Sequence, residues 1–183
     1  PGQHLAERGP KLFAFVDLYQ LHSVLTQGDV WVLPTMLRVV LLQAIIGAAS
    51  RLARLPAAKN APPVTHASGG EDDDDIIATA VVSLRKLDRW DWKPAAERLS
   101  VVHRMLADGD PTGHYPAMDY DSRNRYRTVL EKAARTAGRS EVKVAEAALA
   151  LAADSTIPRE RHVGYFLIDA GLRRLETVVG GRP

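Results

Sequence analysis

The chain has 183 residues, a length that fits one globular domain with a buried core. Hydrophobic residues make up 46% and charged residues 25% of the sequence, as in ordinary soluble proteins, and a net charge of +2 is too small to indicate nucleic acid or a membrane surface as a partner. The absence of cysteine excludes disulfide bonds and thiolate metal sites.

The first helical pattern begins at Pro10. Proline suits the first turn of a helix, where its missing N–H would have no partner. The apolar residues that follow have the i, i+3, i+4, i+7 spacing of one helix face: Leu12, Phe15, Val16 and Tyr19. We expect this helix to break near Gly28.

A second, longer helix is predicted over residues 29–55, so that residues 10–55 form a helical hairpin. Thr26 and Asp29 have the spacing of a capping box, although Asp is shorter than the usual Glu. Pro34 lies early in this helix and marks either its first turn or a kink.

The apolar stretch over residues 30–49 is the part of the sequence most similar to a membrane span. Arg38 and Gln43 interrupt it, and the longest run without charge, Val39 to Ser50, has only 12 residues. Because a spanning helix needs about 20 apolar residues, we predict a buried core helix and no membrane span.

Residues 56–75 predict a flexible linker, because they are rich in proline and glycine and show no apolar period. Four aspartates at its end, residues 72–75, precede the next helical stripe and complement the positive end of the helix dipole. We interpret them as solvated capping residues and not as a metal-binding motif, which would follow a buried strand.

Residues 76–179 contain the remaining predicted helices. After the stripe that begins at Ile76, Pro94 opens a helix to about Gly109. The later helices are expected from Asp121 or Ser122 to Ala137 with Gly138 as the stop, from Ser140 to Ala153, and from Pro158 to Ile168 with a short tail at 172–179. With no alternating run long enough for a strand, the sequence predicts one all-α domain, residues 1–183, with six or seven helices.

Trp31 and Arg38 bracket a dense motif, Trp-Val-Leu-Pro-Thr-Met-Leu-Arg. We interpret it as a packed helix junction in which Trp31 is an apolar anchor and Arg38 snorkels or pairs with Asp29 or Asp17. A ligand-binding role for Trp31 or Arg38 is the alternative.

Trp90 and Trp92 flank Asp91 at a predicted helix start, where Asp91 can cap the helix. Two tryptophans so placed can stack on a sugar ring, or they can fasten a helix corner to the core. They are candidate binding residues.

The segment 111–127 concentrates carboxylates, tyrosines and arginines, and its candidate binding residues are Asp119, Tyr120, Arg123 and Arg127. Arg123 and Arg127 share a helix face, and Arg127 can pair with Glu131 four residues on. Arginine favours bidentate contacts to carboxylates or phosphates, so the pattern indicates either an anionic partner or an internal Arg–Asp network.

His162 and Tyr165 are three residues apart, which places them on one face of the predicted last helix, and Gly164 permits a close approach of another backbone. A single histidine among apolar residues is typical of a hydrogen-bonded core histidine. The six histidines are scattered, and no phosphate-binding loop or nucleophile elbow is present, so we predict no catalytic residue, no metal site and no cofactor.

Together, four ordered segments resemble the cyclic β-1,2-glucan synthases, the large membrane glycosyltransferases of bacterial envelopes. The matching residues are Tyr19-Gln20 and Leu25-Thr26 with Trp31 to Arg38; Leu84-Arg85, Asp91-Trp92 and 99–102; Met118-Asp119-Tyr120, Ser122-Arg123 and Tyr126-Arg127; and His162 to Ile168 with Gly171 and Leu175-Glu176. Tyr120 and Ser122 stand where Phe and Thr are common in that family, and both changes keep the packing and capping chemistry. The segment between the first two matches is shorter than the resemblance leads us to expect.

The resemblance implies a helical region that precedes the glycosyltransferase domain of an enzyme polymerising glucose from UDP-glucose into β-1,2-glucan at the cytoplasmic face of the bacterial inner membrane. It also implies that the chain, which begins with Pro1 and not Met, is a piece of a longer polypeptide. We expect a non-catalytic accessory or regulatory domain whose partner is that glycosyltransferase domain. The alternatives are a module that binds UDP-glucose or β-1,2-glucan, and a free-standing helical enzyme using Asp119 and His114.

Overall fold

The computed structural model describes residues 5–54 and 72–180, with side chains from Leu12 onward in the first range. Most of the predicted linker therefore lies outside the described residues. Where the description resumes, Asp73–Asp75 already form the first turn of a helix, so the linker prediction extended three residues too far.

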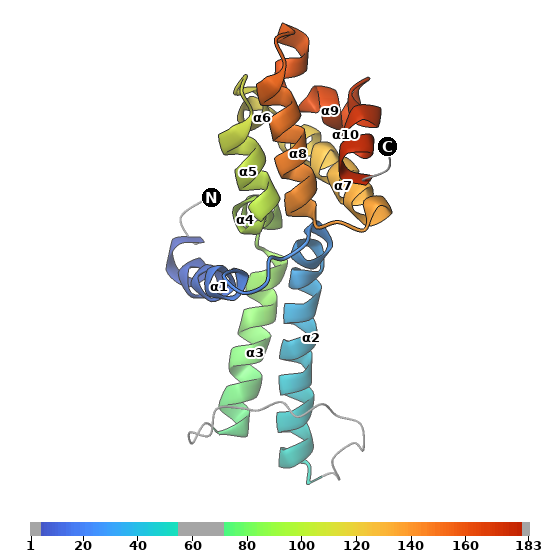
Figure 1. Ribbon diagram of the computed structural model, residues 1–183. Coiled ribbons are helices and arrows are strands. Elements are labelled where there is room, and N and C mark those ends of the chain that lie inside the picture. Colours follow the sequence, from blue (N-terminus) through green and yellow to red (C-terminus); the bar gives the residue numbers. More distant parts are fainter. Residues whose placement is uncertain (1–4, 55–71, 181–183) are drawn as a thin grey trace. The chain divides into compact units, whose positions relative to one another are not determined.

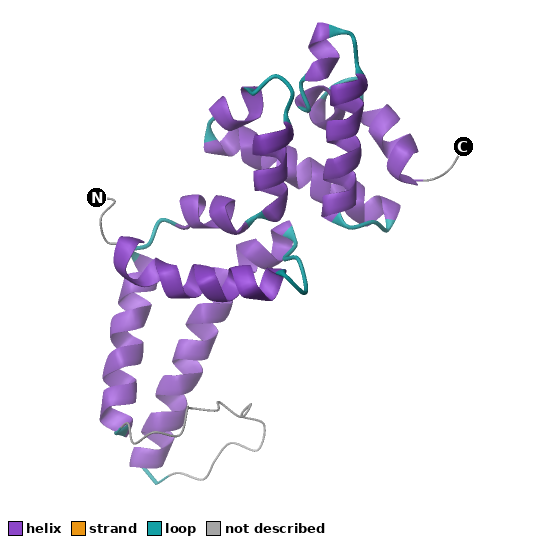
Figure 2. Ribbon diagram, turned by 60° about the vertical axis from the view of Figure 1, so that its left-hand side comes forward, coloured by secondary structure: helices purple, strands orange, loops and turns teal. Residues whose placement is uncertain are grey.

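The all-α prediction is confirmed for the described residues, which contain ten α-helices, one 3₁₀ turn and no strand (Figure 2). The number of helices is larger than the six or seven predicted, because the helix expected from Pro94 to Gly109 is divided, the short helix His114–Ala117 was not anticipated, and the tail at 172–179 is helical. The chain forms two compact units, Trp31–Trp92 and the combination of Pro1–Val30 with Lys93–Pro183. A single domain over residues 1–183 remains a prediction.

The Trp31–Trp92 unit is a hairpin of two long antiparallel helices, α2 (Gln27–Leu52) and α3 (Asp73–Asp88), as Figure 1 shows. Two ion pairs join them, Arg38 to Asp88 at 3.1 Å and Arg51 to Asp73 at 2.6 Å. The predicted partners of Arg38, Asp29 or Asp17, were therefore wrong. Local spacing could not identify Asp88, which lies 50 residues away along the chain.

The start of α2 is the predicted capping box. The Asp29 backbone N–H donates to Thr26 Oγ1 at 3.1 Å, and the Thr26 backbone N–H donates to Asp29 Oδ2 at 2.9 Å. The break predicted near Gly28 is found slightly earlier, at residues 21–26. The next helix begins at Gln27 and continues through Pro34, so Pro34 does not mark its first turn.

The prediction that α2 is a buried core helix is wrong. Only Gln27, Val30 and Ala48 of its residues are buried. The helix is long and apolar enough to cross a membrane, and just 6% of its most apolar 18-residue window is covered by other parts of the structure. Apolar composition predicted burial, but in this unit the other described helix is α3, which two ion pairs join to α2.

The second unit contains α1 (Leu5–Gln20), most of α4 (Trp92–Leu99), α5 (Val101–Gly109), α6 (His114–Ala117), α7 (Tyr120–Ala137), α8 (Glu141–Asp154), α9 (Gly164–Ile168) and α10 (Leu172–Gly180). Helix α8 packs against α5, α7, α9 and α10. Its buried face consists largely of alanines, Ala145, Ala148 and Ala152, whose small side chains let the neighbouring helices approach closely. Around it lie fully buried larger residues, including Leu106, Leu130, Phe166 and Leu175.

Side-chain caps explain where the predicted boundaries failed. The helix expected from Pro94 to Gly109 is two helices, because Ser100 has an extended backbone and its Oγ accepts from the His103 N–H, which starts α5. Asp119, and not Asp121 or Ser122, caps α7. The predicted stop at Gly138 is confirmed, with the left-handed backbone (φ 62°) that glycine adopts without steric cost.

The C-terminal segment differs more from its prediction. In place of one helix from Pro158 to Ile168, the 3₁₀ turn Pro158–Arg161 is followed by the short helix α9, and the predicted tail is the helix α10. His162 lies between the turn and α9 with an extended backbone, so it does not share a helix face with Tyr165.

Candidate functional site

The candidate binding residues do not form one site. Trp90 and Trp92 lie in the hairpin unit, whereas Asp119, Tyr120, Arg123 and Arg127 lie on and before α7 in the other unit.

Arg123 and Arg127 share one carboxylate. Arg123 Nε and Nη2 donate to the two oxygens of Glu97 on α4 at 2.7 and 2.8 Å, a bidentate pair. Arg127 Nη1 donates to Glu97 Oε1 at 3.1 Å. Arg123 also donates through Nη1 to the backbone carbonyls of Pro116 in α6 and of Met118 directly after it. Both guanidinium groups thus join α4 to α7, and that of Arg123 also holds the segment before α7.

Arg127 lies deepest in this network, with 1% of its side chain exposed. Its Nη1 is also 3.2 Å from His103 Nδ1 on α5 and 3.3 Å from the Tyr115 hydroxyl on α6. Because a guanidinium can only donate, His103 Nδ1 acts as an acceptor, and the proton of the neutral ring belongs on Nε2. The predicted Arg127–Glu131 pair is wrong: Glu131 pairs with Arg135 at 2.5 Å on the exposed side of α7.

The electrostatics of this Glu97–Arg123–Arg127 cluster favour an ionised Glu97 carboxylate and neutral side chains at the neighbouring His103 and Tyr115. Burial alone would raise the pKa of Glu97, but hydrogen bonds from Arg123 and Arg127 lower it below its usual value. Burial lowers the pKa of His103, helped by the charges of Arg127 and Arg123 and opposed by Glu97. Burial also raises the pKa of the Tyr115 hydroxyl. These groups form an internal ion pair with neutral donors and acceptors around it.

Asp119 and Tyr120 have structural roles at the start of α7. The Asp119 carboxylate accepts from the Ser122 backbone N–H at 2.9 Å and from the Ser122 hydroxyl at 2.8 Å, and these hydrogen bonds lower its pKa. The Tyr120 ring lies under two cations, with Lys93 Nζ at 4.9 Å and the Arg127 guanidinium carbon at 5.5 Å from its centroid. Asp119 thus caps α7 at the exposed surface, and the Tyr120 ring is partly buried beside Arg127.

The two tryptophans pack on each other. Their ring centroids are 4.3 Å apart and their planes are inclined by 45°, while Trp92 Nε1 donates to the Leu87 carbonyl at 3.4 Å. A flat platform for a sugar requires an open ring face, and tilted rings in mutual contact offer less of one. Trp31, on the neighbouring helix of the same unit, is 47% exposed.

His162 belongs to a second polar cluster, which sequence reasoning missed. Its centre is Asp110, whose carboxylate accepts from the backbone N–H groups of Val163 at 2.9 Å and Tyr115 at 3.1 Å and from the Thr112 hydroxyl at 2.9 Å. His162 Nδ1 lies 3.1 Å from Asp110 Oδ2, and its Nε2 lies 3.1 Å from the Tyr126 hydroxyl on α7. The cluster connects α6, α7 and the start of α9.

Gly164 is needed beside this cluster. A Cβ at this position would collide with the Tyr126 hydroxyl and with His162 Nε2. The sequence correctly predicted a close approach at Gly164, but side chains and not a backbone make it.

Tyr165 lies on the other side, where its ring meets Phe166 edge-on and the Arg159 guanidinium lies 5.8 Å from its centroid.

A sequence signal for Asp110 does exist. Asp110-Pro-Thr-Gly113 has the preferred residues of a β-turn, and the Gly113 N–H donates to the Asp110 carbonyl at 2.9 Å. Glu97 and His103 carry no comparable local signal, because their partners lie on another helix.

A pocket of about 310 Å³ lies elsewhere in the same unit, between the loop before α2, the end of α7 and the start of α8. Its charged residues have partners within the chain: Glu131 with Arg135, Glu141 with the Gln27 N–H at 2.9 Å, and Arg139 with the Val179 carbonyl at 3.4 Å. None of the six candidate binding residues lines it. In the part of the chain that the structure describes, no three His, Asp or Glu side chains cluster as a metal site would require.

The chain is similar to the cyclic β-(1,2)-glucan synthase NdvB of Rhizobium meliloti (strain 1021). The two are 35% identical over 114 residues, a match that covers 58% of this chain and 4% of the length of NdvB. No protein-family model matches the chain, and no solved structure matches it. The comparison supports the relationship predicted from the four motifs, over a small fraction of that relative.

Replacement of Arg127 by methionine should destabilise the chain strongly. The substitution removes a fully buried cation and leaves Glu97, His103 and Tyr115 with unmet hydrogen bonds, which costs about 3 kcal/mol when one partner of a buried ion pair is lost. Urea unfolding followed by circular dichroism measures the change. Arg135→Met is the matched control on the same helix, because its exposed pair with Glu131 contributes only about 0.3–0.5 kcal/mol. Equal effects of the two substitutions would contradict the structural role of Arg127.

Asp110 should make stability depend on pH in the acidic range. Burial would raise its pKa, but hydrogen bonds from His162, Val163, Tyr115 and Thr112 lower the pKa far below the ordinary value. Because the folded pKa is depressed, the stabilisation is complete above the unfolded value of about 3.9 and is lost as the pH falls below it. The excess free energy of unfolding of wild type over Asp110→Asn should therefore be constant between about pH 7 and about pH 5 and shrink from there to about pH 2.5.

The control for this series is Asp154→Asn, at the exposed last residue of α8. Its difference from wild type should stay small throughout. A wild-type advantage over Asp110→Asn that is constant with pH would show that the Asp110 carboxylate is not specially stabilised in the folded chain.

Proposed function

We propose that this chain is a non-catalytic helical accessory domain of a cyclic β-1,2-glucan synthase, which organises or regulates the glycosyltransferase domain of that enzyme. The main support is the Glu97–Arg123–Arg127 cluster. The arginines that best suited a sugar nucleotide already have a carboxylate, two carbonyls, an imidazole and a hydroxyl as partners. The motif residues shared with the synthases thus serve the fold.

The similarity to NdvB supports the identity of the parent enzyme. On this proposal, transfer of glucose from UDP-glucose takes place in another part of the enzyme, at the cytoplasmic face of the inner membrane. The second polar cluster fits the same role, because Asp110 and His162 hold together three helical elements and leave Tyr126 Oη bonded to an imidazole. Burial raises the pKa of Tyr126, which disfavours a nucleophilic phenolate.

Domain exchange tests the accessory role directly. The segment of NdvB that matches this chain is replaced by the matching segment of this chain, and glucan synthesis from UDP-glucose is measured in isolated membranes. We expect the exchanged enzyme to retain synthesis and a version lacking the segment to lose it, because the segment supplies a fold and a contact surface. Wild-type synthesis by the version lacking the segment would overturn the proposal.

Calorimetric titration of the 183-residue chain distinguishes the alternative, a module that binds UDP-glucose or β-1,2-glucan. We expect no saturable heat with either ligand, because the candidate arginines are paired internally and Trp90 and Trp92 cover each other. Saturable binding that is lost in Trp92→Ala, in a sample that remains helical, would establish the binding module instead. Arg135→Ala, on the exposed face of α7, is the control variant.

A further inference from the structure

Helix α2 exposes a continuous stripe with a heptad period. Positions of the a type are Val32, Val39 and Ile46, and positions of the d type are Thr35, Leu42 and Ala49, spaced alternately by three and four residues. All six are exposed, Ile46 to 64%. We refer to these six residues as the α2 seam.

The α2 seam is distinct from the side of α2 that packs on α3. On that side Ala48 is fully buried and Leu37 and Leu41 are partly buried. The ion pairs of Arg38 and Arg51 fix α3 there. α2 thus has two apolar sides, of which α3 covers one. A helix that is apolar all round is normally covered on all sides.

We propose that the α2 seam is a homodimer interface, in which α2 helices from two copies of this chain pack in parallel and in register as a short coiled coil. This inference does not depend on the proposed function. β-Branched residues at a with leucine at d favour two parallel strands, and the seam has Val39 and Ile46 at a on either side of Leu42 at d. From Val32 to Ala49 it extends for about 27 Å, close to three heptads.

The charges beside the seam fit a parallel pair. In that arrangement Arg38 at a g position faces Gln43 of the other copy at e, and Ile45 faces Ser50, so no like charges oppose each other. An antiparallel pair would instead bring the two Arg38 residues close together near the midpoint of the 26-residue helix.

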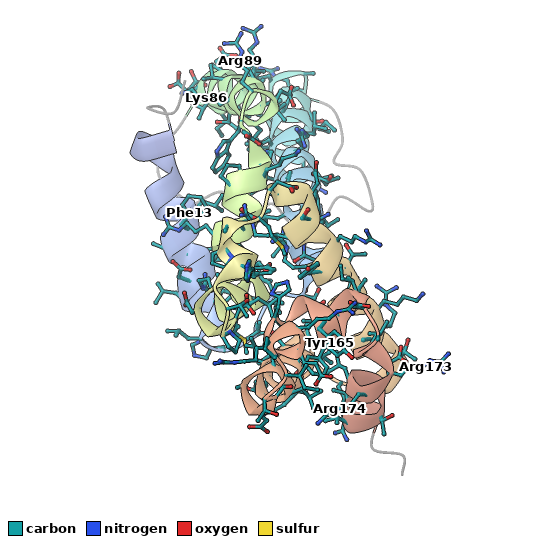
Figure 3. All side chains as sticks on the ribbon, turned by 90° about the horizontal axis from the view of Figure 1, so that it is seen from above. Phe13, Lys86, Arg89, Tyr165, Arg173 and Arg174 are labelled. Atoms are coloured by element: carbon teal, nitrogen blue, oxygen red, sulfur yellow. The ribbon has the colours of Figure 1, made fainter. Side chains whose placement is uncertain are left out.

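A bilayer is a poorer cover for the hairpin than a second copy. The exposed side of α3 carries Asp74, Asp75, Arg85 and Lys86, and Arg89 follows as its exposed C-cap. Figure 3 shows Lys86 and Arg89 extending away from the helix. Immersion of the hairpin in hydrocarbon would remove these charges from water at high cost. A helix against the α2 seam covers the apolar side and leaves the charged side in water.

Light scattering coupled to gel filtration tests the proposal on the whole 183-residue chain. We expect a dimer for the wild type and a monomer for Val39→Glu/Ile46→Glu, with the dissociation constant raised at least about 100-fold, because two carboxylates per chain would be buried in the seam. Val82→Glu is the matched control, since Val82 is an exposed apolar residue on α3 outside the seam, and this variant should remain dimeric. Circular dichroism verifies that all three are equally helical.

Cysteine cross-linking tests the register, and the absence of native cysteine makes each result unambiguous. Thr35→Cys and Ala49→Cys, tested one at a time, should each form a disulfide between two copies on mild oxidation, whereas Val82→Cys should not. Two d positions 14 residues apart can both meet their own counterparts only in a parallel, in-register pair.

Three results would overturn the proposal. The first is a wild type that is monomeric at every concentration, and the second is a dimer that persists in Val39→Glu/Ile46→Glu. The third is a monomer that floats with phosphatidylcholine vesicles and stays in solution when Val39 and Ile46 are replaced by glutamate, which would identify the bilayer as the cover of the seam.

Discussion

The sharing of one carboxylate, Glu97, between Arg123 and Arg127 is the interaction on which the larger unit depends most. It joins α4 to α7 and, through Arg127, reaches His103 on α5 and Tyr115 on α6. An ionised carboxylate with little access to water is stable only where such donors meet it, and a buried guanidinium needs the carboxylate in return. The position of each of these helices is therefore coupled to that of the others.

Sequence patterns correctly predicted the features that depend on residues close together along the chain. The capping box of Thr26 and Asp29, the stop at Gly138 and the all-α class follow from spacing of a few residues, and the structure confirms them. The partner of Arg127 could not be found in this way. Glu131 satisfies the i+4 rule, but the chain folds Glu97 against Arg127, and a buried position favours the partner that is also shielded from water.

The same limit explains the errors for His162 and α2. A residue three positions before Tyr165 shares its helix face only if the helix is continuous there, and the Asp110 carboxylate instead holds the Val163 N–H and the His162 ring in a bend. For α2, the apolar pattern indicates that the helix is buried against some partner, but the composition does not identify that partner. Burial is a property of the assembled structure and not of the helix itself.

Motif similarity between this chain and a glucan synthase therefore carries a specific meaning. If Arg123, Arg127 and His162 served a ligand, their polar atoms would face an open space, yet both arginines bond to Glu97 on α4 and His162 bonds to Asp110 at the end of α5. Residues that are shared because they hold the helices together indicate a shared fold. Features that differ for function then lie on surfaces, and α2 presents an apolar surface with a seam that its own hairpin partner leaves exposed.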